Sequence, residues 1–430
     1  MRDSIKGEFG SLTQEIPEGM PLVDEWLKRF EGQRPLEGVT ALLIQHQLGN
    51  QVPQVRALLD LGLAPERLFW LDIPYTSNAT TRAHVARVMG VPERNFIVSD
   101  YDVLEPYAPY QRARTQRILK HWLDDPPERL LVLDDGAYFL EAAACFRKRL
   151  SHVAIVEQTT RGFIKIDKHA HLQAYAATVP VVDVARSRPK LELEPAFIGH
   201  AVCAALLAKL GDRFHGAHGK RAVLLGYGAI GSRVAKFLET YLGFRRDRVH
   251  VFDPHTQSLE AATAAGFGIW DRADRGTRFS LVIGCSGRAS FRVGDYVYLE
   301  DGAVLASASS GSVELSRQDF IDLADTSEDD DIWIEKDGLD RGRIHTDLRF
   351  RLVDREATLV NAGFPVNFDG RVNCVPTQYM QPTALMMVAA SVQALSTPER
   401  GRVDLAPDFC EWVDGAFREF LGPDASVLDD

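Results

Sequence analysis

The clearest pattern in the sequence is a repeated alternation of short apolar runs with stretches of helical periodicity. Apolar runs at residues 41–45, 68–71, 96–98, 130–133 and 153–156 each end in polar or ionisable residues. This alternation is typical of a parallel α/β sheet, in which the carboxyl ends of the strands share one edge. We therefore expect four strand-end side chains to gather there, although each could instead cap a helix or a turn: His46, Asp72, Asp135 and Glu157.

A second α/β pattern begins after residue 196. Residues 179–184 predict a further strand of the first unit, and the charged, proline-containing residues 185–195 predict a linker or hinge. A helix is expected over residues 196–210. A strand over residues 221–225 then leads into a glycine-rich turn, a helix to residue 242 and a strand over 248–252 that ends at Asp253.

The glycine-rich turn at residues 226–231 fits a dinucleotide-binding motif. Gly226 permits the tight turn, Gly228 lets the backbone approach a pyrophosphate, and Gly231 lets the helix pack close to the strand. The start of the helix offers free N–H groups to phosphate, and Asp253 would accept hydrogen bonds from the adenosine ribose. No arginine follows Asp253 directly, so NAD is favoured over NADP. A glycine turn with Asp253 as a cap is the structural alternative.

Composition excludes several classes of partner. The chain has 430 residues with a formal net charge of −11, which disfavours nucleic acid and anionic membrane surfaces. No signal peptide pattern and no spanning segment is recognised, and the five cysteines are scattered without a disulfide or metal-binding spacing. We therefore expect a cytoplasmic protein without a metal site that acts on a small molecule.

The order of several short motifs resembles the S-adenosylhomocysteine hydrolase family, the adenosylhomocysteinases. The resemblance extends from about Gly19 to about Leu395. Its pieces are Gly19-Met20-Pro21-Leu22, Pro35-Leu36-Glu37-Gly38, Leu133-Asp134-Asp135-Gly136, Glu157-Gln158-Thr159-Thr160-Arg161-Gly162, Gly226 to Gly231, Val313-Glu314-Leu315 and Leu359-Val360-Asn361-Ala362-Gly363. In that family, bound NAD transiently oxidises a ribose 3′-hydroxyl, so that the 5′ substituent can be eliminated and water added.

The resemblance assigns roles to particular residues. Lys190 stands where the family has a lysine that assists proton transfer at the 3′ position, with Glu194 four residues on in place of an aspartate. That spacing would pair the two side chains on a helix, although Pro189 and Pro195 favour a loop. The remaining assignments are His46 and Asp135 as further catalytic residues; Asn50, Gln158, Thr159 and Thr160 as substrate-binding residues; and Gly226, Gly228, Ile230, Gly231, Asp253, Ser286, Gly287 and Asn361 as cofactor-binding residues.

The sequence departs from the family where the family reads the adenine base. Leu48 and Asn50 replace polar residues after His46, Gln158 replaces a glutamate, and two family histidines fall near Ser310 and Val375. The usual C-terminal Lys–Tyr tail, which reaches a neighbouring subunit, is not recognisable. We therefore expect a divergent, homo-oligomeric enzyme with a nucleoside-like substrate. Hydrolysis, elimination, epimerisation and simple oxidation all stay open, as do a true hydrolase with a remodelled base pocket and a catalytically silent NAD-binding regulator.

The predicted fold class is α/β with two doubly wound domains. A Rossmann NAD-binding domain, residues 197–365, is expected to be inserted into a split substrate domain. The substrate domain would comprise residues 1–196 and a return segment with a C-terminal tail, residues 366–430. The substrate is expected in the cleft between the two domains.

Overall fold

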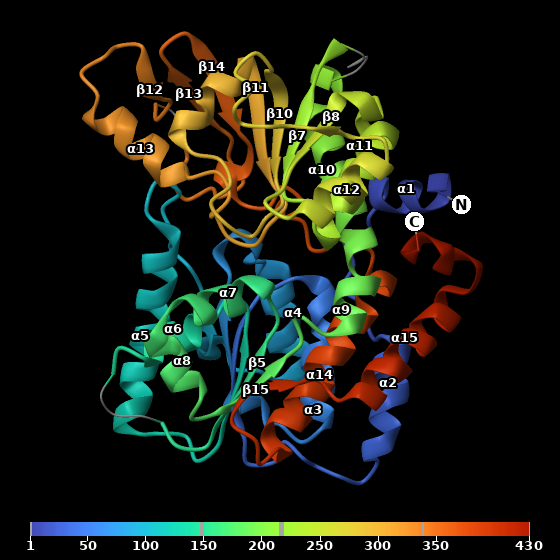
Figure 1. Ribbon diagram of the computed structural model, residues 1–430. Helices are drawn as coiled ribbons and strands as arrows, with labels where there is room; N and C mark the ends of the chain where they lie inside the picture. The colour runs from blue at the N-terminus through green and yellow to red at the C-terminus, as the bar shows by residue number, and fades with distance from the viewer. Residues whose placement is uncertain (1, 147–149, 215–218, 338, 430) are drawn as a thin grey trace.

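The computed structural model describes residues 2–146, 150–214, 219–337 and 339–429. These residues form two α/β lobes, one built on each of two sheets (Figure 1). The α/β class with two doubly wound units, predicted from the alternating pattern, is confirmed.

The first sheet is fully parallel in the described part of the chain. Its order is β15-β6-β5-β4-β1-β2-β3, and β15, near the C-terminus, pairs in parallel with β6. The C-terminal segment therefore returns to the sheet made by the N-terminal part. The strands are β1 (Thr40–Gln45), β2 (Leu68–Asp72), β3 (Phe96–Ile97), β4 (Leu130–Asp134), β5 (Val153–Glu157), β6 (Pro180–Asp183) and β15 (Gly401–Asp404).

The second sheet has the order β12-β13-β14-β11-β10-β7-β8-β9. Its core is parallel, but β12, β13 and β14 pair with one another in antiparallel fashion at one edge, an extension that the sequence pattern did not predict. The strands are β7 (Ala222–Leu225), β8 (Val249–Phe252), β9 (Gly268–Ile269), β10 (Phe279–Gly284), β11 (Leu299–Ser307), β12 (Ile332–Ile334), β13 (Leu348–Leu352) and β14 (Arg355–Leu359).

Helices cover the sheets of both lobes. Helix α14 contacts β4, β5 and β6, and α10 packs along α11 beside the second sheet. Apolar side chains of β1, β4 and β5 point alternately into two different clusters, as expected for strands that are covered on both faces. The helices are α1 (Arg2–Gly10), α2 (Pro21–Leu27), α3 (Val52–Asp60), α4 (Ala79–Met89), α5 (Tyr107–Asp124), α6 (Tyr138–Ala143), α7 (Thr160–Lys168), α8 (Ala170–Ala176), α9 (Arg188–Leu193), α10 (Pro195–Phe214), α11 (Ala229–Leu242), α12 (Thr256–Ala264), α13 (Arg317–Thr326), α14 (Gln381–Ser396) and α15 (Pro407–Leu421).

The segment predicted as a linker or hinge, residues 185–195, is largely helical, so the loop conformation expected from its prolines was wrong. Its role as a hinge stays a prediction. Pro189 lies in the first turn of α9, and Pro195 is the first residue of α10. In a first turn the missing N–H of proline costs no helical hydrogen bond, and its fixed φ suits the helix. The prolines therefore start helices here instead of preventing them.

One helical stretch, Arg188–Gly211, is long and apolar enough to cross a membrane by length and composition. Its most apolar window has a mean hydropathy of 1.4, but 61% of that window is buried inside the protein. Because α10 packs on α11, core packing accounts for this apolar character.

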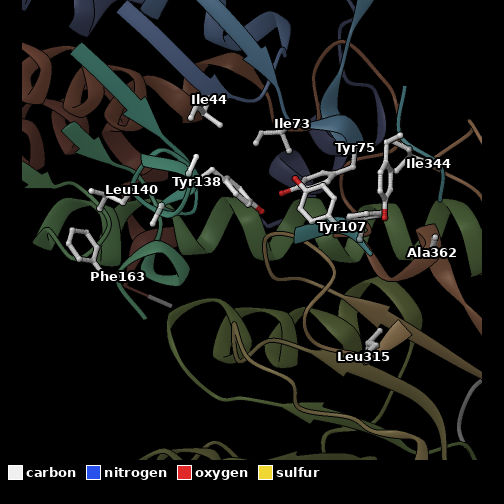
Figure 2. Packing of buried hydrophobic residues seen from close by; sticks show 14 of the residues in the cluster. Ile44, Ile73, Tyr75, Tyr107, Tyr138, Leu140, Phe163, Leu315, Ile344 and Ala362 are labelled. Carbon is white, nitrogen blue, oxygen red and sulfur yellow. The ribbon is translucent and has the colours of Figure 1, made fainter. Parts of the chain in front are cut away.

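An aromatic cluster joins the two lobes. Tyr75 and Tyr107 of the first lobe pack on Phe364, which follows the second sheet, with ring centroids 5.0 and 5.1 Å apart. Figure 2 shows Tyr75, Tyr107 and Tyr138 close together, where the two lobes meet. The backbone N–H of Gly311 donates to the Tyr75 hydroxyl across the junction at 3.1 Å.

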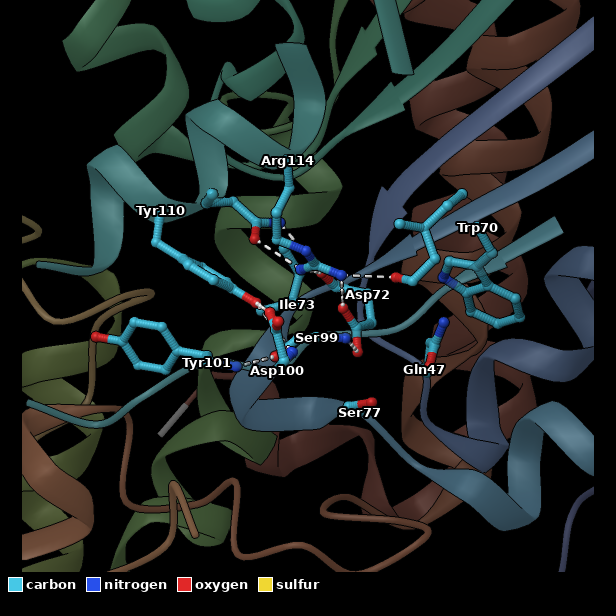
Figure 3. Close-up of polar contacts among 12 residues, drawn as sticks. Gln47, Trp70, Asp72, Ile73, Ser77, Ser99, Asp100, Tyr101, Tyr110 and Arg114 are labelled. Carbon is cyan, nitrogen blue, oxygen red and sulfur yellow. Dashed lines mark hydrogen bonds and ion pairs between the residues drawn. The ribbon is translucent and has the colours of Figure 1, made fainter. Parts of the chain in front are cut away.

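Asp72, one of the strand-end residues, is buried by an arginine instead of facing a cleft. Arg114 of α5 reaches its carboxylate (Nη2 to Oδ1, 2.5 Å) and also donates to the Ile97 carbonyl at 2.6 Å (Figure 3). The Ser99 N–H donates to the other carboxylate oxygen at 3.1 Å. The pair therefore fixes the end of β2 and the segment after β3.

We expect Arg114→Met to lower the free energy of unfolding by about 3–5 kcal/mol, because it leaves a buried carboxylate without its counter-ion. Urea unfolding measures this change. Arg112→Met is the control, since Arg112 makes a partly exposed pair with Glu141 at 3.6 Å, and such pairs contribute about 0–1 kcal/mol. Equal effects of the two substitutions would contradict the assignment.

Candidate functional site

The site lies where the strand order of each sheet reverses. In the first sheet β2 lies on one side of β1 and β4 on the other, and in the second sheet β8 and β10 flank β7 in the same way. Ligands of open α/β sheets bind at such switch points, outside the carboxyl ends of the strands. His46 follows β1, Asp135 follows β4, and the glycine turn follows β7.

His46 and Asp135 form a buried pair at the first switch point. His46 Nε2 lies 3.2 Å from Asp135 Oδ2, and His46 Nδ1 lies 2.7 Å from the Thr76 hydroxyl oxygen. The Thr76 hydroxyl also lies 3.0 Å from the Ile73 carbonyl oxygen, and its single hydrogen can be donated to either acceptor. One proton bridges the contact between His46 Nε2 and the Asp135 carboxyl group.

Asp135 also keeps an unused acceptor. Its Oδ1 is buried and has no hydrogen-bond partner among the described residues. Buried polar atoms without partners are rare in folded proteins, so this oxygen is suited to accept a hydrogen bond from a bound hydroxyl. The preceding Asp134, not Asp135, caps α6 by accepting the N–H groups of Tyr138 and Phe139, and burial raises the pKa of Asp134 to about 7.

Lys190 and Glu194 form the second charged pair of the site. Their side chains contact each other between α9 and the start of α10, and both are largely buried. The Thr383 hydroxyl donates to the same oxygen of Glu194 at 2.6 Å. Glu194 therefore holds the Lys190 ammonium group at one position, while Thr383, on α14, holds Glu194.

The glycine turn fits a dinucleotide. Gly226 has φ of +111°, and a Cβ atom at Gly231 would lie 2.2 Å from the Gly226 carbonyl oxygen, so neither position accepts a side chain without strain. A Cβ atom at Gly228 would meet nothing within 4 Å. Gly228 precedes α11 and no side chain caps that helix. Its first N–H groups are thus free for a phosphate.

Asp253 lies at the end of β8, as the motif requires. Its Oδ2 accepts the Tyr227 N–H of the glycine turn at 2.7 Å, and its Oδ1 accepts the His255 N–H at 2.9 Å. The carboxylate therefore shapes the turn, and each oxygen keeps a lone pair for a ribose hydroxyl.

Glu314 organises the loop after β10. Its buried carboxylate accepts hydrogen bonds from the Ser286, Ser290 and Ser309 hydroxyls and from the Gly287 N–H. Burial raises the pKa of Glu314 above its ordinary value, and these hydrogen bonds oppose that effect. Ser286 and Gly287 are thereby held beside the start of α11.

A single cavity of about 390 Å³ brings most of the predicted residues together. Its wall includes both charged pairs, the start of α11 and parts of the loops after β10 and β11. The predicted residues that line it are His46, Asn50, Asp135, Gln158, Thr159, Thr160, Lys190, Glu194, Ile230, Ser286 and Gly287. The three motif glycines, Asp253 and Asn361 do not line it.

The resemblance places Asn361 at the nicotinamide side, but its side-chain amide group bonds to the backbone of the turn that follows it. It has φ of +49°, and its Nδ2 faces the carbonyl oxygens of Pro365, Val366 and Phe368 within 3.3 Å. Its buried Oδ1 has no partner among the described residues. The side chain thus holds the connection that leads back to the first lobe, and the neighbouring Asn367 lines the cavity instead.

Glu157 and Gln158, at the end of β5, make their hydrogen bonds to other residues of the first lobe. Glu157 accepts the N–H groups of Gly136, Ala137 and Thr159, and burial raises its pKa well above the ordinary range. The side-chain Oε1 of Gln158 accepts a hydrogen bond from Gln45 Nε2 at 2.6 Å. Glu157 is therefore a turn-holding residue, contrary to the expectation that it faces the cleft.

The residues that depart from the family lie on the cavity wall. Leu48, Asn50, Ser310 and Val375 all line it. The Asn50 amide already donates to the Val375 carbonyl at 3.3 Å. Three glutamines that could have replaced the lost polar contacts do not line the cavity. Gln45 bonds to Gln54 and Gln158, Gln378 donates to Glu8, and Gln47 accepts from Arg82 while its buried Nε2 has no partner among the described residues.

Thr383, Arg161 and Cys285 also belong to the site, although no role was expected for them from the sequence. Arg161 and Cys285 line the cavity, and Thr383 supports Glu194. Arg161 lies within the motif Glu157 to Gly162, at a position where the resembling family has threonine. That exchange is the sequence feature that could have indicated a role for Arg161. Nothing in the local sequence pointed to Thr383, because it reaches Glu194 only through the return of the C-terminal segment.

The C-terminal residues pack on their own chain. Val427 and Leu428 are buried, and Arg233 of α11 donates to the Leu428 carbonyl at 2.6 Å. Figure 1 shows the two chain ends near each other, beside α11 and α15.

Comparisons with known proteins describe relatives without assigning an activity. No family model matches the chain. The uncharacterized proteins Rv0104 and MT0113 of two Mycobacterium tuberculosis strains are 27% identical over 383 residues, which cover 86% of this chain and 66% of theirs. The chain therefore spans slightly less than two thirds of the length of these relatives.

Solved structures with related architecture are distant. An oxidoreductase from Ralstonia solanacearum has a TM-score of 0.40 at 16% identity, over 84% of this chain and 97% of its own. L-tryptophan dehydrogenase from Nostoc punctiforme has a TM-score of 0.31 at 11% identity, over 92% and 90% of the two chains. Likenesses this weak assign no activity to the chain, and only the residues of its site bear on function.

Proposed function

We propose that this protein is an NAD-dependent enzyme that transiently oxidises a ribose-type hydroxyl of a nucleoside-like substrate. Oxidation of that hydroxyl to a carbonyl group makes the hydrogen on the neighbouring carbon acidic. Loss of that proton permits elimination, addition or epimerisation at this carbon. The observation that carries the proposal is the cavity itself. It joins the His46–Asp135 and Lys190–Glu194 pairs to the loops that surround a dinucleotide-binding turn.

The residues of the second lobe would hold the cofactor. The start of α11 would bind the pyrophosphate, and Asp253 would bind the adenosine ribose. The loop held by Glu314 would contact the nicotinamide half. When bound, NAD supplies a hydride acceptor for the oxidation of the hydroxyl.

The residues of the first lobe would move the protons. Lys190 Nζ passes one of its protons to the Glu194 carboxylate as it takes the proton of the hydroxyl that is oxidised, and both transfers reverse when the carbonyl is reduced. Thr383 holds Glu194 in position for this exchange. The His46–Asp135 pair exchanges a proton with the neighbouring carbon or its leaving group. The unpartnered Asp135 Oδ1 is available to orient a second hydroxyl.

The reaction is tested by loading the protein with NAD and recording the absorbance of reduced nicotinamide after mixing with ribonucleosides and sugar acids. We expect at least one of these to reduce the bound cofactor. Tight NAD binding without reduction by any hydroxylated compound would contradict the proposal and favour a silent NAD-binding protein.

Asp253→Ala is expected to weaken NAD binding by about 1–3 kcal/mol, the range for a lost hydrogen bond to a charged group. Calorimetry with NAD and NADP measures it. Asp247→Ala is the control, because Asp247 is an exposed carboxylate just before the same strand. Equal or tighter binding of NADP by the wild-type protein would contradict the role given to Asp253 in NAD binding. An unchanged NAD affinity of Asp253→Ala would contradict it as well.

A further inference from the structure

Arg161 places a guanidinium group in the cavity from the first turn of α7. Its Nη1 donates to the Ser310 carbonyl, after β11 of the other lobe, at 3.0 Å. A Cβ atom at Gly311 would lie 1.7 Å from that nitrogen, and Gly311 has φ of +75°. The glycine therefore leaves the space into which the arginine reaches.

No carboxylate pairs with Arg161 among the residues that the structure describes. The groups facing it are Tyr138, Tyr75, Tyr107 and Asp135. Burial raises the pKa of Tyr75 and of Tyr107 well above the ordinary value, so these phenols stay neutral and cannot balance the charge. Figure 2 shows the three tyrosines close to one another where the two lobes meet.

The other charged groups that line the cavity are paired with one another. Lys190 contacts Glu194, and His46 contacts Asp135. Arg161 is thus the charged group of the lining that has no ion-pair partner among the described residues, and the nicotinamide ring of bound NAD would add a further positive charge. Charged groups inside proteins are normally paired, so this arrangement suits a ligand that brings the missing negative charge.

We infer that Arg161 binds an anionic group of the substrate, a carboxylate or a phosphate. This inference rests on the proposed function and deepens it, since it defines the substrate as a hydroxylated acid or a sugar phosphate rather than a neutral nucleoside. A planar guanidinium binds both groups through two parallel N–H donors. Because Arg161, Lys190 and His46 line one cavity, the anionic group lies within one small molecule's reach of the hydroxyl that is oxidised.

Calorimetry on NAD-loaded protein tests the inference with matched probes. Ribose is compared with ribose 5-phosphate, uridine with uridine 5′-monophosphate, and glucose with glucuronate. We expect at least one anionic probe to bind roughly 10- to 100-fold more tightly than its neutral partner, as for charge-assisted hydrogen bonds. Arg161→Met should abolish that preference, Arg161→Lys should keep part of it, and NAD affinity should be unchanged in both.

Arg186→Met is the matched control, because Arg186 is paired with Asp167 on the same lobe and does not line the cavity. Equal binding of neutral and anionic probes, or a preference that survives in Arg161→Met, would overturn the inference. A fall in NAD affinity in Arg161→Met and Arg161→Lys would assign the guanidinium to the cofactor and also overturn it. An anion preference without any reduction of NAD would refute the proposed function while leaving the role of Arg161 intact.

Discussion

Replacing Lys190 with alanine is expected to lower the rate at which substrate reduces bound NAD by roughly 10²–10⁴-fold, the contribution of a positioned acid–base group. Lys190 lines the cavity, and its Nζ is held by Glu194, which accepts from Thr383. Removing the side chain takes away the group that accepts the hydroxyl proton, without touching the glycine turn. NAD affinity should therefore change little, whereas the free energy of unfolding should fall because the largely buried Glu194 loses its cationic partner.

Stopped-flow absorbance of reduced nicotinamide measures this rate. Glu192→Ala is the control, because Glu192 lies on the same helix but is exposed and does not line the cavity. A rate in Lys190→Ala close to that of the control would show that Lys190 does not transfer the proton.

S-adenosylhomocysteine is expected to bind at least a hundredfold more weakly than a substrate whose base or ring is fully hydrogen-bonded. Leu48 offers no polar atom to a purine, and Ser310 and Val375 provide no imidazole. Each buried polar group left without a partner costs about 1–3 kcal/mol, so two such losses amount to roughly a hundredfold or more in affinity. Gln45, Gln47 and Gln378 do not line the cavity, so none of them replaces these contacts there.

Steady-state hydrolysis of S-adenosylhomocysteine by NAD-loaded protein, followed as thiol release, checks this expectation. Little or no turnover should be seen. Turnover at ordinary enzyme rates with micromolar affinity would instead identify a true hydrolase with a remodelled base pocket.

Much of the fold and part of the site could be predicted because the relevant signals are local. Each parallel strand is a short apolar run, so the position directly after it is readable from the sequence, as at His46 and Asp135. The glycine turn is likewise defined by the steric demands of Gly226 and Gly231. The doubly wound topology then brings these strand ends together at the switch points.

The remaining features depend on contacts between distant segments. No local pattern indicated that Arg114 would bury Asp72, since the two residues lie on different elements. The same holds for Thr383 on Glu194 and for Arg161 against Ser310 of the other lobe. The prolines of residues 185–195 led us to expect a loop. Proline breaks a helix when it lies in the helix interior, but Pro189 lies in the first turn of α9, where it is tolerated.

The central claim, that oxidation is transient and activates a neighbouring carbon, is tested most directly by deuterium incorporation. A compound found to reduce the bound NAD is incubated in D2O with NAD-loaded protein, and the recovered alcohol is analysed by mass spectrometry and NMR. We predict deuterium at the carbon next to the oxidised hydroxyl, with no net accumulation of reduced cofactor. Steady accumulation of reduced cofactor and ketone, with no deuterium in the recovered alcohol, would contradict the account and indicate a simple dehydrogenase.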